Sequence, residues 1–183
     1  MTPRLAVIVF ASLLLLGACG REEDAPPAPA AMTEAAMGRY CGMNILEHAG
    51  PKGQIILSRY IEPVWFSSAR DAIAFTMLPE EPKDIRAIYV SDMAKAPSWD
   101  KPGAKNWIEA RKAFFVIGSA VRGGMGAAEA VPFSTAQAAA AFVREHGGSM
   151  VRFDGIPRSY ILEQQAGEDA RAPSGERGQD DVR

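Results

Sequence analysis

A cysteine and a methionine stand two residues apart in the stretch RYCGMNILEHAGPKG, as Cys41 and Met43. In an extended segment, side chains at this spacing point to the same side, so both sulfur atoms could bind the same metal ion. Thiolate and thioether ligands favour Cu(I). Structural zinc takes four Cys or His ligands. The chain offers two His and, once Cys19 is assigned to a lipid anchor as argued below, one free Cys. The pair indicates a soft-metal site, with an inert buried cysteine or an intermolecular disulfide as the alternatives.

Two more methionines and a histidine are candidate ligands because of where they stand. Met93 ends a predicted strand in YVSDMAKAPSW, and Met125 lies in the glycine-rich segment RGGMGAAEAVPF. His48 follows Met43 by five residues and adds an imidazole. His146 stands at the end of a predicted helix, where the helix dipole explains it. Two other methionines are predicted to be core residues: Met77 and Met150.

The N-terminal residues predict the compartment. An apolar run from Leu5 to Leu16 is too short to cross a bilayer as a helix and is typical of a cleaved signal. It ends in LGAC, which resembles a bacterial lipobox. Residues 1–18 are therefore predicted to be a lipoprotein signal peptide, with lipids on Cys19 that hold the chain on a membrane facing the periplasm. Gly20 is not the aspartate associated with inner-membrane retention, which favours the outer membrane.

Lipidation of Cys19 would leave Cys41 as the second and last cysteine, without an intramolecular partner. Exported proteins usually pair their thiols, so an unpaired one calls for an explanation. Loss of residues 1–18 removes one positive charge, Arg4, and takes the formal net charge from −2 to −3. No basic stripe supports nucleic-acid binding. Residues 19–38 are predicted to be a flexible linker, rich in Ala and Pro, and residues 164–183 a disordered tail.

A repeat organises the segment between these ends. WFSSARDAIAF (65–75) and PFSTAQAAAAF (132–142) align at an offset of 67 residues, with six identities in eleven positions. Each copy reads as a short apolar strand, a serine able to cap a helix, and a helix. The helices are expected to end near Leu78 and His146.

Apolar, β-branched segments flank both copies of the repeat and are predicted to be strands. Residues 54–60 and 85–91 flank the first copy, and residues 113–119 and 149–154 flank the second. The sequence thus predicts an α+β fold of two related ββαβ units, at residues 39–95 and 96–163.

Taken together, these motifs resemble the NosL family of nitrous-oxide reductase accessory lipoproteins. The resemblance rests on the lipobox, YCGMN, YVSDMAKA and GGMG, and extends over roughly residues 38–160. It implies a membrane-tethered Cu(I) metallochaperone that faces the periplasm and serves denitrification, with two related ββαβ units. It also implies Cys41, Met43 and Met93 as metal ligands, with His48 and Met125 as further candidates. The implied partners are a membrane ABC-type maturation complex and nitrous-oxide reductase.

Two functions of other classes remain open at this point. A thiol-dependent enzyme would use Cys41 as its nucleophile with His48 as the nearby base, although no nucleophile motif surrounds the pair. A structural lipoprotein would bury Cys41 and bind no metal. The resemblance favours a protein that is not an enzyme.

Overall fold

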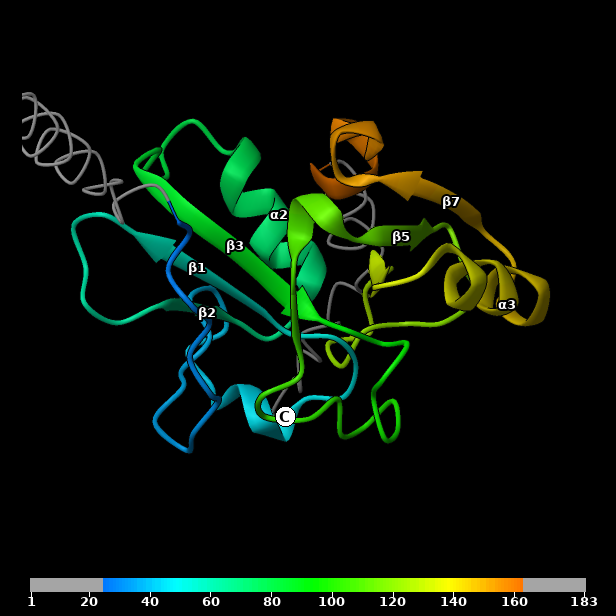
Figure 1. The fold of residues 1–183 in the computed structure, drawn as a ribbon, viewed down its shortest axis with the longest axis horizontal. Helices are drawn as coiled ribbons and strands as arrows, with labels where there is room; N and C mark the ends of the chain where they lie inside the picture. The colour runs from blue at the N-terminus through cyan, green and yellow to red at the C-terminus, as the bar shows by residue number, and fades with distance from the viewer. Residues whose placement is uncertain (1–24, 163–183) are drawn as a thin grey trace, which may run out of the picture.

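The computed structural model describes residues 25–162 of the chain and contains two antiparallel sheets, each covered by one α-helix (Figure 1). This arrangement confirms the predicted α+β class. The predicted signal peptide, Cys19 and the predicted tail at residues 164–183 lie outside the described residues. Among the described residues, no helix is both long and apolar enough to cross a membrane.

The first sheet has four strands in the order β2-β1-β3-β4. The strands are β1 (Gly53–Leu57), β2 (Val64–Phe66), β3 (Ile85–Ser91) and β4 (Trp107–Glu109). Helix α2 (Ala69–Met77) packs on this sheet and buries six of its nine residues. The larger hydrophobic cluster forms at this contact and includes Ile55, Phe66, Ile73 and Phe75.

The second sheet has three strands in the order β6-β5-β7, all paired antiparallel. The strands are β5 (Phe114–Ile117), β6 (Val131–Phe133) and β7 (Ser149–Arg152), with helix α3 (Ala136–His146) packed against them. Three short 3-10 helices are also present: η3 (Ile45–Glu47), η4 (Ala110–Lys112) and η5 (Phe153–Gly155). The last described residues, 158–162, are helical as well.

The repeat produces the same local structure twice. In each copy a three-residue strand leads into a helix whose first turn is capped by the residue after the aligned serine. Ser68 Oγ accepts a hydrogen bond from Asp71 N–H at 3.0 Å, and Thr135 Oγ1 accepts one from Ala138 N–H at 3.2 Å. These bonds satisfy amide groups that the first turn of a helix leaves free. The helices end at Met77 and His146, as the sequence predicts.

Strand β4 departs from the predicted division into units at residues 95 and 96. It belongs to the second half of the chain but pairs antiparallel with β3 of the first sheet, with Val90 opposite Ile108. Three strand ends also differ from the predicted ranges, and one of them is that of β5, which ends at Ile117 rather than at residue 119. β1 stops at Leu57, next to an irregularity in its pairing with β3, and β7 stops at Arg152, where η5 begins.

The predicted flexible linker is wrong for residues 25–38, which pack on the folded part. Gln54 in β1 binds the backbone of Ala30 twice, through Oε1 and Nε2, each at 2.9 Å. The side chains of Met32 and Ala36 are buried in a small cluster with Ile45. Their apolar surface explains the order, because a segment that buries such groups no longer behaves as a free coil.

Met77 packs against the larger cluster, as predicted, whereas Met150 does not join a core. Met150 lies in β7 with its side chain largely exposed, and three of the four β7 residues are exposed. The expectation of a buried Met150 was wrong because β7 is at the edge of its sheet and little of the chain covers it.

Candidate metal centre

Cys41 lies in a tight loop beside the end of β2. Gly38 N–H donates to Met43 C=O at 2.8 Å and Gly42 N–H donates to Gly38 C=O at 2.9 Å, which closes the loop. Gly42 has φ of +66°, so the segment is a turn and the expected same-side placement in an extended strand does not apply. A Cβ on Gly38 would stand 2.6 Å from the sulfur atom of Cys41. Glycine is needed there for the thiol to occupy its place.

The Cys41 thiol is partly exposed, and Ser67 is its nearest polar side chain. The Sγ atom lies 3.6 Å from Ser67 Oγ and 3.9 Å from the carbonyl oxygen of Met43. Ser67 is buried where β2 gives way to α2, so the thiol is placed by a well-packed part of the first sheet. A partly exposed thiol at this position is accessible to a soft metal ion.

Cys41 and Met125 line one cavity of about 190 Å³. Met125 comes from a glycine-rich loop in which Gly123 N–H donates to Ala127 C=O at 2.9 Å. Gly124 packs against the backbone of Ala49, where a Cβ would stand 2.6 Å from the amide nitrogen. This close approach carries the loop from the second half of the chain to the Cys41 region, and leaves Met125 with 51% of its surface exposed.

A buried acid forms the wall of this cavity. Glu129 Oε1 accepts hydrogen bonds from the backbone N–H of Arg70 and of Ala130, both at 2.9 Å. Complete burial raises the pKa of Glu129 to about 8, although these hydrogen bonds act in the opposite direction. Arg70, buried in the first turn of α2, donates instead to the carbonyl oxygens of Ala128 and Ile161.

Lys52, the residue directly before β1, is buried, and its side chain lies near the end of β2. Its Nζ donates to the carbonyl oxygens of Ala49, Gly50 and Ser67 at 2.9, 2.8 and 3.3 Å. Burial lowers the pKa of Lys52 to about 8, while the proximity of Glu129 and Cys41, when these groups are ionised, opposes that change. The lysine therefore joins the backbone on both sides of the Cys41 region.

The remaining candidate ligands occupy three different surroundings. Met43 is 39% exposed and lies in the same loop as Cys41. Met93 is partly buried and packs against the second, smaller cluster, which includes Val116 and Phe133. His48 lines a separate cavity of about 140 Å³, and its Nε2 atom is buried without a hydrogen-bond partner among the described residues.

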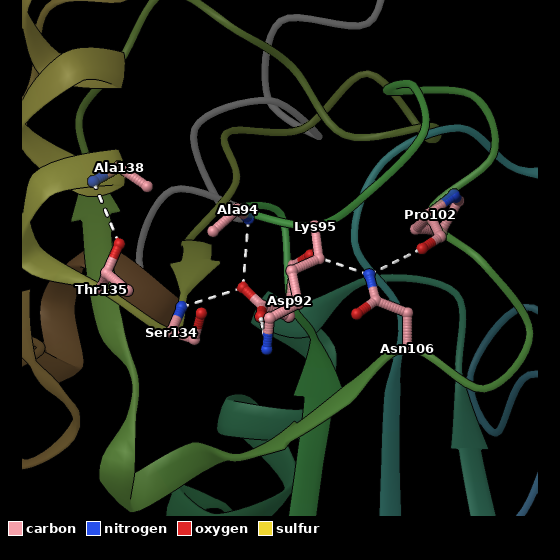
Figure 2. Close-up of polar contacts among 8 residues, drawn as sticks. All are labelled: Asp92, Ala94, Lys95, Pro102, Asn106, Ser134, Thr135 and Ala138. Atoms are coloured by element: carbon pink, nitrogen blue, oxygen red, sulfur yellow. Dashed lines mark hydrogen bonds and ion pairs between the residues drawn. The ribbon is translucent and has the colours of Figure 1, made fainter.

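Asp92 fixes the backbone around Met93 (Figure 2). Its Oδ1 accepts from Ala94 N–H at 3.1 Å and from Ser134 N–H at 2.9 Å, while Lys95 Nζ lies 3.1 Å from Oδ2. Burial acts to raise the pKa of Asp92, but the bonds from Ser134, Lys95 and Ala94 outweigh it and hold the pKa below its usual value. Met93 N–H donates in turn to Pro132 C=O at 2.9 Å. The two sheets meet at this point.

The structure thus brings Cys41 and Met125 to one cavity. Met43 shares the loop of Cys41 but does not line that cavity, and Met93 and His48 lie in other packing environments. Within residues 25–162, no group of three or more His, Cys, Asp or Glu side chains is placed to hold a metal ion. Sequence patterns did not indicate Ser67, Glu129 or Lys52 as residues of the site. Glu129 had a recognisable signal, since a single acid stands inside the apolar run GAAEAVPF, whereas nothing in the sequence marks Lys52 as buried.

The NosL family model matches residues 29–161 of the chain. The chain belongs to the NosL family. It is 50% identical over 157 residues to a copper-binding lipoprotein NosL from Achromobacter cycloclastes, covering 85% of this chain and 81% of the relative. It is 32% identical over 175 residues to the copper-binding lipoprotein NosL of Stutzerimonas stutzeri, covering 91% and 90%.

A solved NosL structure agrees with this assignment. The crystal structure of the copper chaperone NosL from Shewanella denitrificans superposes with a TM-score of 0.68 at 37% identity, covering 73% of this chain and 99% of that one. The resemblance to the NosL family that the motifs indicate is therefore confirmed. These NosL relatives are named as binding proteins rather than catalysts, in agreement with the expectation that the chain is not an enzyme.

Proposed function

We propose that this chain is a Cu(I) chaperone whose metal site is built around Cys41. The observation that carries the proposal is the shared cavity, at which a partly exposed thiol from the first half of the chain meets an exposed thioether from the second. Soft sulfur donors suit Cu(I), and a site open to solvent suits a cargo that must be passed on. The copper-binding names of the relatives support the same function.

The proposed ligands are Cys41, Met43 and Met93, with Met125 and His48 as further candidates. The structure offers two candidates for the third ligand position, Met125 and Met93, which lie in different surroundings. Met125 already lines the cavity with Cys41, whereas Met93 packs against the second cluster and would have to leave it. A direct comparison of these two methionines therefore defines the site.

The test is a competitive Cu(I) titration of the full mature chain with a chromophoric chelator, under reducing conditions. Cys41→Ser is expected to lower the affinity at least 100-fold, because it removes the only thiolate and its charge from the site. Met43→Leu and Met93→Leu are each expected to lower it roughly tenfold while the fold persists, since Leu and Met have similar volumes. Met125→Leu is measured beside them as the competing third ligand. Met150→Leu is the matched control, because this exposed methionine lies in β7.

X-ray absorption at the copper edge then counts the sulfur ligands. A sulfur count that falls in Met93→Leu but not in Met125→Leu would assign the third position to Met93. Unchanged affinity in Cys41→Ser would contradict the chaperone and leave a structural lipoprotein. Metal-independent turnover that needs Cys41 would instead support the thiol enzyme, for which the separate cavity of His48 is unfavourable.

The membrane anchor and the direction of delivery complete the proposal. Lipids on Cys19 would hold the chain on a bacterial membrane facing the periplasm, with the outer membrane favoured by Gly20. Copper would pass to a membrane ABC-type maturation complex and on to nitrous-oxide reductase in denitrification. Cells with Cys41→Ser should make reductase that lacks part of its copper when copper is limiting, and excess copper should partly restore it. A fully loaded reductase in those cells would contradict delivery.

A further inference from the structure

The most exposed large apolar side chain in the described residues belongs to Ile61, in the loop that joins β1 and β2. It is 99% exposed, and the adjacent Tyr60 is 52% exposed. Isolated exposed apolar residues are common. An isoleucine and a tyrosine side by side at the tip of a hairpin are a different case, because together they form a protruding apolar point with a polar phenol beside it.

The position of the chain's first described residues relates this tip to the membrane. In Figure 1 the blue start of the described chain lies at the same end of the first sheet as the loop between β1 and β2. The residues that follow this start are held on the sheet, since Tyr89 of β3 donates its hydroxyl to Pro27 C=O at 2.7 Å and Gln54 binds Ala30. Gln54 and Tyr89 are paired across the strands, near the end of β1 away from the loop. The first described residues therefore stay on this side of the sheet unless these bonds break.

The length of chain between the proposed lipid and this start is short. Only residues 20–24 separate Cys19 from Ala25. Even fully extended, six Cα-to-Cα steps span about 20 Å. A globular part of this size is roughly 35 Å across. The tether is thus shorter than the body it holds, so the end of the sheet that carries Ala25 must stay close to the bilayer.

We infer that Tyr60 and Ile61 are a second membrane contact, which inserts into the bilayer to which Cys19 is attached. This inference rests on the proposed lipid anchor. Ile61 would enter the acyl boundary, and Tyr60 would stay at the headgroup level, where its apolar ring and polar hydroxyl both find suitable surroundings. The neighbouring Arg59 is paired with Asp84 at 3.0 Å, and the charged Glu62 would remain among the headgroups.

This contact fixes the orientation of the candidate metal centre. The tip precedes β2, whereas Cys41 is next to Ser67, which follows β2 at its other end. With the tip in the lipid, the cavity shared by Cys41 and Met125 lies at the end of the hairpin that points away from the bilayer. The chain would then present its cargo to partners at a constant angle and height.

The test uses the full mature, lipidated chain in vesicles of phosphatidylethanolamine and phosphatidylglycerol in a 3:1 ratio. Spin labels are attached in a Cys41→Ser background, at Ile61→Cys or, as the matched control, at Met150→Cys in β7, a strand at the opposite end of Figure 1. Collision rates with oxygen and with a water-soluble nickel chelate report the depth of each label. The oxygen-to-nickel ratio is expected to be at least fivefold higher at position 61 than at position 150.

A second variant checks that the apolar tip itself enters the lipid. Tyr60→Asp in the Ile61→Cys background should return the label toward the value at position 150, while the chain stays on washed vesicles through its lipids. Equal ratios at positions 61 and 150 in a chain that stays on the vesicles would overturn the tip contact and leave the anchor intact. A chain that washes off as readily as Cys19→Ser would overturn the anchor and the tip contact with it.

Discussion

The two copies of the repeat form nearly the same helix but bury it very differently. Helix α2 buries six of its nine residues, including a phenylalanine and an arginine. Helix α3 buries only one of its eleven residues, an alanine. Figure 1 shows the reason in outline, since α2 lies in the middle of the molecule and α3 at its edge. Residues from the second half of the chain, such as Ala130, Ile156 and Ile161, complete the cluster around α2.

The difference shows that local sequence and tertiary burial are specified separately. The strand, cap and helix follow from a few aligned residues, and these are present in both copies. The extent of burial depends on what the rest of the chain adds over each helix. The first copy became the centre of the core, and the candidate metal centre is built at its border, where the Met125 loop arrives from the second half.

The largest difference between the copies is expected at the aligned phenylalanines. Phe75→Ala should lower the free energy of unfolding by about 3–5 kcal/mol, because Phe75 is fully buried in the larger cluster. Phe142→Ala should cost about 1–2 kcal/mol, because Phe142 is only partly buried beside Trp99 and Phe133. Urea unfolding followed by circular dichroism measures both values. Equal losses would contradict the unequal burial of the two helices.

The second expected difference is in pH dependence, because the first turn of α2 donates to Glu129, whose pKa is raised, whereas the pKa of Asp92 near the start of α3 is lowered. Folded Glu129 keeps its proton up to about pH 8, whereas the unfolded chain releases it near 4.5. Folding therefore takes up a proton between these values, and stability should fall as the pH rises from 5 to 7.5, by roughly 1–3 kcal/mol. Below pH 8 the lowered pKa of Lys52 adds little to this slope, because Lys52 differs in protonation mainly above that pH.

Glu129→Gln should flatten this pH profile, since the amide oxygen still accepts from Arg70 and Ala130 N–H and no proton is taken up. Glu145→Gln in α3 is the control, because Glu145 is exposed. Unfolding curves at pH 5, 6 and 7.5 provide the comparison. Parallel profiles for the wild type and Glu129→Gln would mean that Glu129 does not couple folding to protons.

The smallest effects should be the same in both copies. Ser68→Ala and Thr135→Ala each remove one capping bond and should each cost about 1 kcal/mol. Ser68→Thr and Thr135→Ser keep a hydroxyl at each cap and should change stability by a few tenths of a kcal/mol. A cap that matters in one copy only would show that even the local structure depends on its surroundings.

Much of the fold was predictable because it is local. Strand composition and the capping residues placed both helices and the strands next to them within a few residues. Three features depend on contacts distant in the sequence and were not predictable from local patterns. They are the pairing of β4 with β3, the packing of Met32 against Ile45, and the exposure of Met150.

The candidate site divides in the same way. The types of its residues indicated a soft metal, and the glycines beside Cys41 and Met125 were visible in the sequence. Their meeting at one cavity was not, because it depends on Gly124 packing against Ala49, 75 residues earlier in the chain. The sequence also suggested an extended Cys-x-Met segment, whereas the positive φ of Gly42 makes it a turn.

The late arrival of β4 has a consequence for the order in which the protein matures. When the chain emerges with its N-terminus first, β3 is complete once Ser91 has appeared. The strand that pairs with its free edge, β4, is complete only at Glu109. An uncovered edge invites pairing with other chains. The guanidinium of Arg70 gains its partner even later, because it donates to the carbonyl oxygen of Ile161. The contacts of the first sheet are therefore complete only when almost all of the described residues have emerged. Until then the chain is incompletely folded, and the free edge of β3 can pair with other chains.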